Sequence, residues 1–139
     1  MRYEMRNTEF KIALTQGLVA SGQVVEGRTL IDETIREVGE NRDLFFMPEA
    51  LRVKGCVLLL MPESGVDDAE ACFMQSFELS RRQGARAWEL RTAIDLAALL
   101  ADQGRPDNAR ALLRPIFEER GLDTADLKAA KSLLADLKS

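Results

Sequence analysis

The chain has 139 residues, of which 46% are apolar and 30% charged, and its net charge at pH 7 is −4. This length suits one domain with its own buried core, and the negative charge argues against nucleic acid as a partner. The sequence has no apolar run near the roughly 20 residues that span a bilayer, and it has no histidine, the commonest general base and metal ligand, so membrane, metal and cofactor partners are not expected.

The first predicted helix carries two apolar stripes. Phe10, Leu14 and Leu18 recur every fourth residue, and Ile12 and Val19 form a second stripe. A helix that is apolar on two sides packs between neighbours, so we expect both stripes of this helix to be covered.

Glycine and proline mark the boundaries of the helices that follow. Gly22, Gly39 and Gly84 are placed to end the first, second and fourth predicted helices. Pro48 and Pro106 are placed in the first turns of the third and the sixth, where a missing N–H costs no hydrogen bond. This punctuation predicts helices joined by short turns, and the alternating apolar pattern of strands is absent.

The C-terminal third continues the pattern. The fifth predicted helix, between Gly84 and Gly104, is the most apolar, so we expect it in the middle of the stack. Pro115 lies inside the sixth helix and should kink it or end its regular hydrogen bonding early, and Thr124 is placed as the N-cap of a seventh. Because short loops make consecutive helices neighbours, the predicted fold class is all-α, with about seven antiparallel helices.

A helix–turn–helix phrase recurs along the chain. The stretches GQVVEGRTLI and GRPDNARALL begin at Gly22 and Gly104, and each runs from a turn into a helix. A small residue in the second helix is followed four residues later by a large apolar one, with a period of about 41 residues. These pairs are Gly27 with Ile31, Ala69 with Phe73, and Ala109 with Leu113. A small side chain lets two helices cross closely. Because the pattern occurs three times, it predicts three helical pairs.

This pattern of small, bulky and turn residues resembles the tetratricopeptide repeat. The resemblance implies a right-handed α–α superhelix in a single domain over residues 1–139. The repeats would cover residues 8–39, 48–83 and 86–120, and a closing helix would cover residues 124–138. The usual period is about 34 residues, so the longer period here implies longer helices.

A narrower resemblance covers most of the chain. The stretches ALRVKGCVLLL, AEACFMQSFELSRRQGARAWELRTAIDLAALLADQGRPDNARALLRPIF and DTADLKAAKSLL are similar to the C-terminal repeat region of certain bacterial multidomain regulators. Those proteins carry an adenylate/guanylate cyclase-like or winged-helix domain and a signal-transduction ATPase ahead of the repeats. The chain has no GxxxxGK phosphate loop, so the resemblance implies the sensing or interaction part alone, as a fragment or a free-standing relative.

Tetratricopeptide arrays use the inner helix of each pair to line a concave groove that takes peptides or partner helices. By repeat position, the candidate groove residues have mixed polarity: Glu9, Ile12, Gln16, Glu49, Arg52, Cys56, Arg91, Ile94, Asp95 and Ala98. Only Arg52 and Arg91 offer cations for a partner's C-terminal carboxylate, so we do not favour that mode of binding. The alternative, that these positions are simply solvated helix faces, stays open.

A solenoid without a preceding repeat leaves part of its first helix uncovered, and exposed apolar faces mark interfaces. We expect exposed apolar residues in the first helix and in the connection between the second and third helices. The candidates for self-association are therefore Ile12, Val19, Phe45 and Phe46. The hypothesis is a homodimer that forms through one of these surfaces.

Together these features predict a non-catalytic protein-interaction or sensing module of a bacterial signalling or transcription-regulating protein. Its partner would be a protein, a peptide or another domain of a larger regulator. The N-terminus lacks the apolar centre of a signal peptide, which predicts a cytoplasmic protein whose two cysteines, Cys56 and Cys72, are free thiols. Two alternatives stay open: a structural module for homo-oligomerisation, and an enzyme, which the missing histidine disfavours. No catalytic, metal-binding or cofactor-binding residue is expected.

Overall fold

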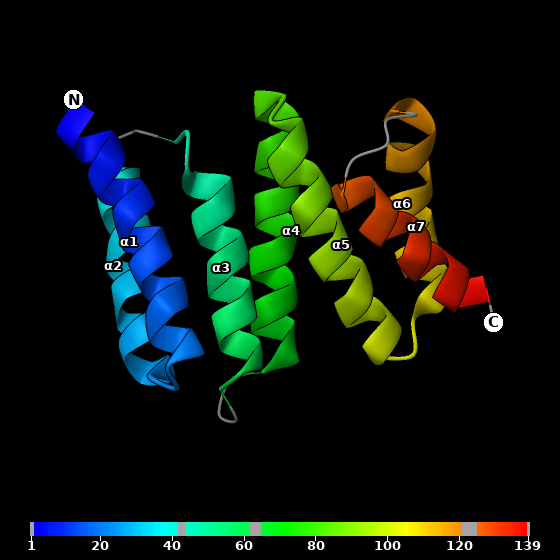
Figure 1. The fold of residues 1–139 in the computed structure, drawn as a ribbon, viewed down its shortest axis with the longest axis horizontal. Helices are drawn as coiled ribbons and strands as arrows, with labels where there is room; N and C mark the ends of the chain where they lie inside the picture. Colours follow the sequence, from blue (N-terminus) through cyan, green and yellow to red (C-terminus); the bar gives the residue numbers. More distant parts are fainter. Residues whose placement is uncertain (1, 42–43, 62–64, 121–124, 139) are drawn as a thin grey trace. The chain divides into compact units, whose positions relative to one another are not determined.

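The helical periodicity of the sequence is realised in the computed structural model, which describes residues 2–41, 44–61, 65–120 and 125–138. These residues form seven α-helices and no strand, which confirms the all-α prediction (Figure 1). The helices are α1 (Arg2–Ala20), α2 (Val24–Asn41), α3 (Met47–Leu59), α4 (Val66–Gln83), α5 (Arg86–Asp102), α6 (Pro106–Arg120) and α7 (Ala125–Lys138).

The chain divides into two compact units, residues 1–79 and 80–139, with the boundary inside α4. Each repeat of a solenoid contacts only its neighbours, so such a boundary does not by itself distinguish one repeat domain from two. The predicted single domain over residues 1–139 therefore stays a prediction.

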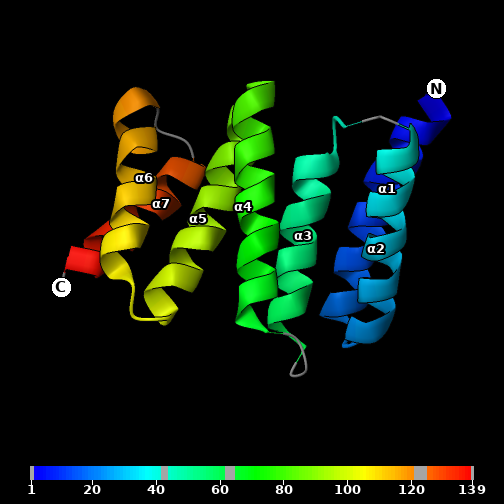
Figure 2. The same ribbon diagram turned by 180° about the vertical axis from the view of Figure 1, so that it is seen from behind.

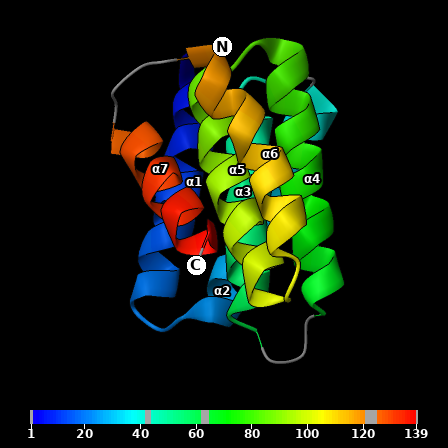
Figure 3. The same ribbon diagram turned by 90° about the vertical axis from the view of Figure 1, so that its right-hand side faces the viewer.

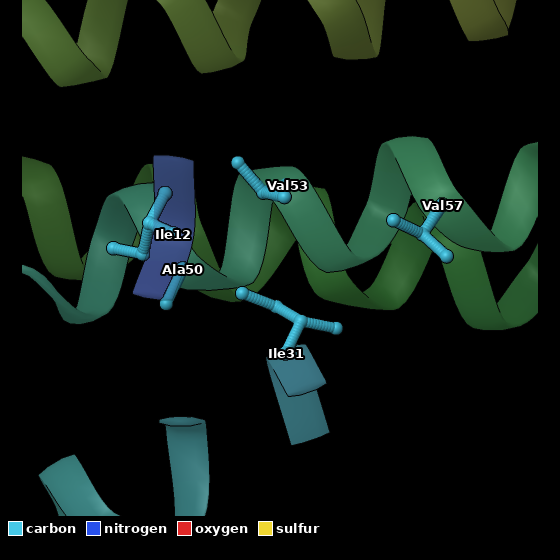
Figure 4. Packing of buried hydrophobic residues seen from close by; sticks show 5 residues of the cluster. All are labelled: Ile12, Ile31, Ala50, Val53 and Val57. Carbon is cyan, nitrogen blue, oxygen red and sulfur yellow. The ribbon is translucent and has the colours of Figure 1, made fainter. Parts of the chain in front are cut away.

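The first unit is built on α1, α2 and α3, which all contact one another. The helix α1 runs antiparallel to α2, in front of it in Figure 1 and behind it in Figure 2. A core cluster, made of Ile12, Ile31, Ala50, Val53 and Val57, joins the three helices. In Figure 4, Ile12 of α1 and Ile31 of α2 lie against the α3 members of this cluster.

The turn between α1 and α2 depends on a glycine in the left-handed conformation. Gly22 has a φ of +86°, which a residue with a Cβ rarely adopts. Around it, the N–H of Gln23 donates to the carbonyl of Leu18 at 2.8 Å and the N–H of Gly22 donates to that of Val19 at 3.0 Å. These two bonds form a Schellman motif, which satisfies carbonyls that the end of the helix leaves unpaired. Gly104, with a φ of +75°, closes α5, so both reversals are confirmed.

Small residues permit close crossings within the first unit. A methyl group at Gly27 of α2 would lie 2.8 Å from Cγ2 of Val19 on α1, and one at Gly55 of α3 would lie 2.6 Å from Cε1 of Phe73 on α4. Neither site has room for a larger side chain, so the predicted packing role of Gly27 is confirmed. The same principle accounts for Gly55.

One predicted helix end is wrong, and a second prediction is wrong in part. Gly39 does not close α2, which continues to Asn41, and Gly39 does not take the positive φ of a helix stop. Pro115 does not end α6, which continues to Arg120, and the alternative that Pro115 kinks the helix stays a prediction. The next residue, Ile116, is only 4% exposed, and its burial favours the helical turn that follows the proline.

The first helix is covered on one side only. Ile12 is 5% exposed and Val19 packs against the core cluster, whereas Phe10 is 63% and Leu14 43% exposed. The expectation that both stripes of this helix are covered is therefore wrong. Among the described residues, α2 and α3 pack on α1, and they cover the stripe of Ile12 and Val19.

In the second unit, α5 packs against both α6 and α7, and α6 also packs against α7 (Figure 3). The buried residues of α5 spread around the helix from Glu89 to Leu100, as its broad apolar surface predicted. Thr124, the predicted N-cap of α7, lies outside the described residues.

Candidate functional site

An open pocket of about 190 Å³ lies between α1 and α3 in the first unit. Its lining comes from one turn of α1 and two turns of α3: Gln16, Val19, Ala20, Arg52, Val53, Cys56 and Val57. Four of these seven side chains are aliphatic, and the others offer an amide, a guanidinium group and a thiol. Such a mainly apolar cavity with a few polar groups is typical of a binding site.

Helical spacing brings these side chains to the pocket. Positions three and four apart share one face of a helix, so Gln16 and Ala20 lie together on α1, as do Arg52 and Cys56 on α3. The helices α1 and α3 point in the same direction in Figure 1, because α2 returns the chain between them. Val53 and Val57 belong to both the core cluster and the pocket wall, so the core fixes the wall's position.

A bidentate ion pair stands at the pocket. The Nε of Arg52 donates to Oε1 of Glu49 at 2.7 Å, and its Nη2 donates to Oε2 at 2.9 Å. Both side chains are largely buried, with 15% of Arg52 and 13% of Glu49 exposed. Two parallel bonds from a guanidinium group to a carboxylate hold both partners in a defined geometry. The charge of Arg52 is thereby balanced within its own helix.

The two cysteines have different surroundings. Cys56 is half-buried and lines the pocket, whereas Cys72 of α4 is buried, and both are free thiols, as predicted. Burial raises the pKa of the Cys72 thiol above its ordinary value of about 9, and the nearby Lys54 partly opposes this rise. Of the two thiols, only that of Cys56 is part of the pocket.

A group of charged side chains ties α2 to α3 outside the pocket. The Nζ of Lys54 lies 2.9 Å from Oδ1 of Asp32, and the Nε of Arg28 lies 3.5 Å from Oδ2. Oδ1 is buried, and although Lys54 is at ion-pair distance, no group among the described residues donates an aligned hydrogen bond to it. Since Asp32 has two cationic neighbours, we assign this group a structural role.

The predicted groove residues of α1 and α3 fall into three sets. Gln16 and Arg52 line the pocket, together with Cys56, and Glu49 is joined to it through Arg52. Glu9 is exposed on α1. Ile12 is buried in the core cluster and does not line the pocket, so its place in a groove stays a prediction.

The remaining groove candidates lie on α5, in the second unit. Arg91 is exposed, and Ile94, Asp95 and Ala98 are half-buried. They are not part of the pocket, and a groove that joins them to α1 and α3 stays a prediction.

The candidates for self-association differ in exposure. Ile12 is buried in the core and Val19 is half-buried against it, so the expected exposure of this stripe is wrong. Phe45 is 55% exposed, whereas Phe46 packs against the core cluster. The two rings meet edge to face, and their centroids are 4.9 Å apart. Phe10, which is 63% exposed on α1, was missed as a candidate.

Sequence reasoning also missed the aliphatic walls of the pocket, Val19, Ala20, Val53 and Val57. The spacing of these residues follows the same helical faces as Gln16 and Cys56, so periodicity contained a signal for them. It did not indicate that α1 and α3 leave a gap between these faces.

The described residues contain no group of three or more acidic or cysteine side chains placed to hold a metal ion. Nor does any of the described helices combine the length and the apolarity needed to cross a bilayer. No protein-family model matches the chain, and comparison with the curated proteins gave no match either.

Proposed function

We propose that the chain is a non-catalytic interaction module that binds a peptide or a helix of a partner protein at the pocket between α1 and α3. The observation that carries this proposal is the pocket itself, which is mainly apolar and has Gln16 and Arg52 among its lining residues. Apolar recesses with a few oriented polar groups suit peptides, whose side chains fill them while their backbone meets the polar groups.

The same proposal includes the architecture of a tetratricopeptide-like solenoid. The helical pairs would be α1–α2, α3–α4 and α5–α6, closed by α7, and they would form a right-handed superhelix. Support comes from the small residues at the close crossings, Gly27 and Gly55, and from the glycine reversals at Gly22 and Gly104. In such an array α1 and α3 are inner helices, and the pocket between them is part of the concave surface.

The proposal also includes the biological setting. The resemblance of the sequence to the repeat region of bacterial multidomain regulators supports a role in signalling or transcription regulation in the cytoplasm. The partner is then a separate protein or another domain of the regulator. A chain without histidine lacks the commonest catalytic base, which favours binding over catalysis.

A peptide-display selection tests the binding proposal. The full chain is used to select from a random peptide library, and the affinities of the selected peptides are measured by fluorescence anisotropy. We expect Gln16→Ala and Arg52→Ala to weaken binding by about tenfold or more, which corresponds to about 1.4 kcal/mol.

The matched controls are Gln75→Ala on α4 and Arg36→Ala on α2, because both residues are exposed and neither lines the pocket. These variants should bind like the parent chain. Peptides whose affinity is the same for the pocket variants and the controls would show that the binding surface is elsewhere.

Self-association is a second candidate function, and the exposure of Phe10 and Leu14 favours it. These side chains stand one turn apart on α1, on the side that α2 and α3 leave open. An apolar face of this kind is typical of an interface.

A further inference from the structure

We infer that the pocket between α1 and α3 takes a single uncharged side chain of about leucine size, and that Cys56 sets the size it accepts. This inference rests on the proposed function and names the chemistry of the partner's anchor residue. It follows from the pocket's volume, its charge balance and the division of its wall between core and non-core residues.

The volume limits the occupant. The volume of this pocket is about 190 Å³, whereas the pockets that bind drug-sized ligands and cofactors measure roughly 300–1,000 Å³. A cavity of about 150 Å³ with apolar walls is large enough for a benzene-sized group. The pocket is therefore too small for a nucleotide and suits one large apolar side chain of a peptide.

The charge balance excludes an anionic anchor. Arg52 is the only cationic residue in the lining, and Glu49 holds its guanidinium group through two hydrogen bonds. A carboxylate that entered the pocket would have to compete with Glu49, whose negative charge also repels it. A cationic group in the pocket would lose its hydration and contact mainly aliphatic side chains, which costs a large solvation free energy. An uncharged apolar group meets neither obstacle.

Cys56 is the wall residue best placed to vary the pocket's depth. Val53 and Val57 are 3% and 2% exposed and belong to the core cluster, and Val19 packs against it, so their size is constrained by packing. Cys56 is half-buried, is not a member of that cluster, and lies on α3 one turn beyond Arg52. A change in its side chain alters the volume of the pocket and leaves the core contacts in place.

The first experiment uses small probes whose backbone charges are blocked. The full chain, labelled with ¹⁵N, is titrated with N-acetyl-leucine amide, with the α-amide of N-acetyl-glutamate, whose side chain bears a carboxylate, and with N-acetyl-lysine amide. We expect the uncharged probe alone to shift the amide signals of Ala20, Cys56 and Val57. It should also slow alkylation of Cys56 by N-ethylmaleimide several-fold.

The inference is overturned if the carboxylate or the lysine probe binds as tightly as the uncharged one, or if no probe shifts the pocket signals. A variant tests the charge argument separately. Glu49→Gln removes the carboxylate that balances Arg52, so it should admit the glutamate probe, which the parent chain is expected to exclude. If the variant still excludes this probe, the ion pair is not what rejects anions.

The second experiment changes the size of the pocket. Cys56→Ala enlarges it and should shift the preference several-fold from N-acetyl-leucine amide towards N-acetyl-phenylalanine amide. Cys56→Leu fills the pocket and should abolish the shifts from both probes. The matched control is Cys72→Ala, which makes the same substitution on α4, outside the pocket, and should keep the parent preference. An unchanged preference in Cys56→Ala, in a chain that melts cooperatively, would refute the role of Cys56.

These outcomes separate the inference from the proposed function. Peptides that depend on Gln16 and Arg52 but are not displaced by N-acetyl-leucine amide would refute the apolar anchor and leave peptide binding intact. Peptides that are insensitive to every pocket variant would refute the proposed function, and with it the anchor.

Discussion

At Gly55, the structure has no room for even one methyl group. A Cβ there would lie 2.6–2.9 Å from three atoms of the Phe73 ring, and Phe73 is fully buried. We predict that Gly55→Ala lowers the free energy of unfolding by about 1–3 kcal/mol, because overpacking outweighs the better helix propensity of alanine. Urea unfolding followed by circular dichroism measures the difference.

The control for this prediction is the same substitution at Gly17. This residue is exposed on α1, and a Cβ there would meet no atom within 4 Å. Gly17→Ala should therefore raise the free energy of unfolding by about 0.5–1 kcal/mol, the gain in helix propensity alone. Equal effects at the two positions would show that propensity and not packing decides the outcome.

Cys72 links the stability of the first unit to pH. Burial raises the pKa of its thiol, so the unfolded chain loses this proton at lower pH than the folded chain does. The thiol's contribution to stability is complete at neutral pH and is lost as the pH rises above about 9 and through the raised pKa.

We predict that Cys72→Ala reduces the loss of stability between about pH 7 and about pH 10, measured by urea unfolding at each pH. Ser76→Ala is the comparison, because Ser76 is also buried on α4 and its hydroxyl does not titrate in this pH range. It should leave this pH dependence close to that of the parent chain. A parent-like loss of stability in Cys72→Ala would contradict the prediction.

Among the elements, α3 and α4 are joined by a buried hydrogen bond as well as by the Gly55–Phe73 contact. The hydroxyl of Ser76 donates to the carbonyl of Pro48 at 2.7 Å, and Ser76 is fully buried. We predict that Ser76→Ala lowers the free energy of unfolding by about 0.5–1.5 kcal/mol, the net value of one such bond.

The matched control is Ser21→Ala. The Ser21 hydroxyl donates to the carbonyl of Gly17 at 3.0 Å, but it does so at an exposed turn, where water can replace it. This variant should stay within about 0.5 kcal/mol of the parent chain, as surface substitutions usually do. If both serine variants unfold like the parent, the Ser76 bond does not hold the pair together.

The helix boundaries show how far local patterns reach. Gly22 and Gly39 stand in similar sequence positions, each after an apolar helical stretch, yet only Gly22 takes a positive φ. Gly22 lies in the short turn where the chain reverses from α1 into α2, whereas Gly39 lies inside α2, which continues for two more residues. A glycine permits a reversal, and the packing of the flanking helices decides whether one occurs.

At the scale of the whole molecule, the open side of α1 is a surface suited to self-association. Phe10 and Leu14 are 63% and 43% exposed, and a homodimer through them would remove both from water. We predict a dimer in sedimentation velocity, and a monomer after Phe10→Glu or Leu14→Glu with the circular dichroism spectrum unchanged.

Ile12→Asp serves as the contrasting variant, because Ile12 is buried in the core cluster. It should unfold the first unit and not merely dissociate a dimer, since it buries an unpaired charge. A parent chain that sediments as a monomer at high concentration would dispose of the self-association candidate.

The sequence by itself determined the helices, their order and the small residues of the close crossings, because these depend on local backbone preferences and on spacing along one helix. It also named Gln16, Arg52 and Cys56 of the pocket. Only the tertiary structure decided which stripe of α1 is covered, since Phe10 and Ile12 are equally apolar and the choice depends on where α2 and α3 pack. The pocket, too, depends on the separation of two helices that are distant in sequence, and periodicity along each helix contains no information about that separation.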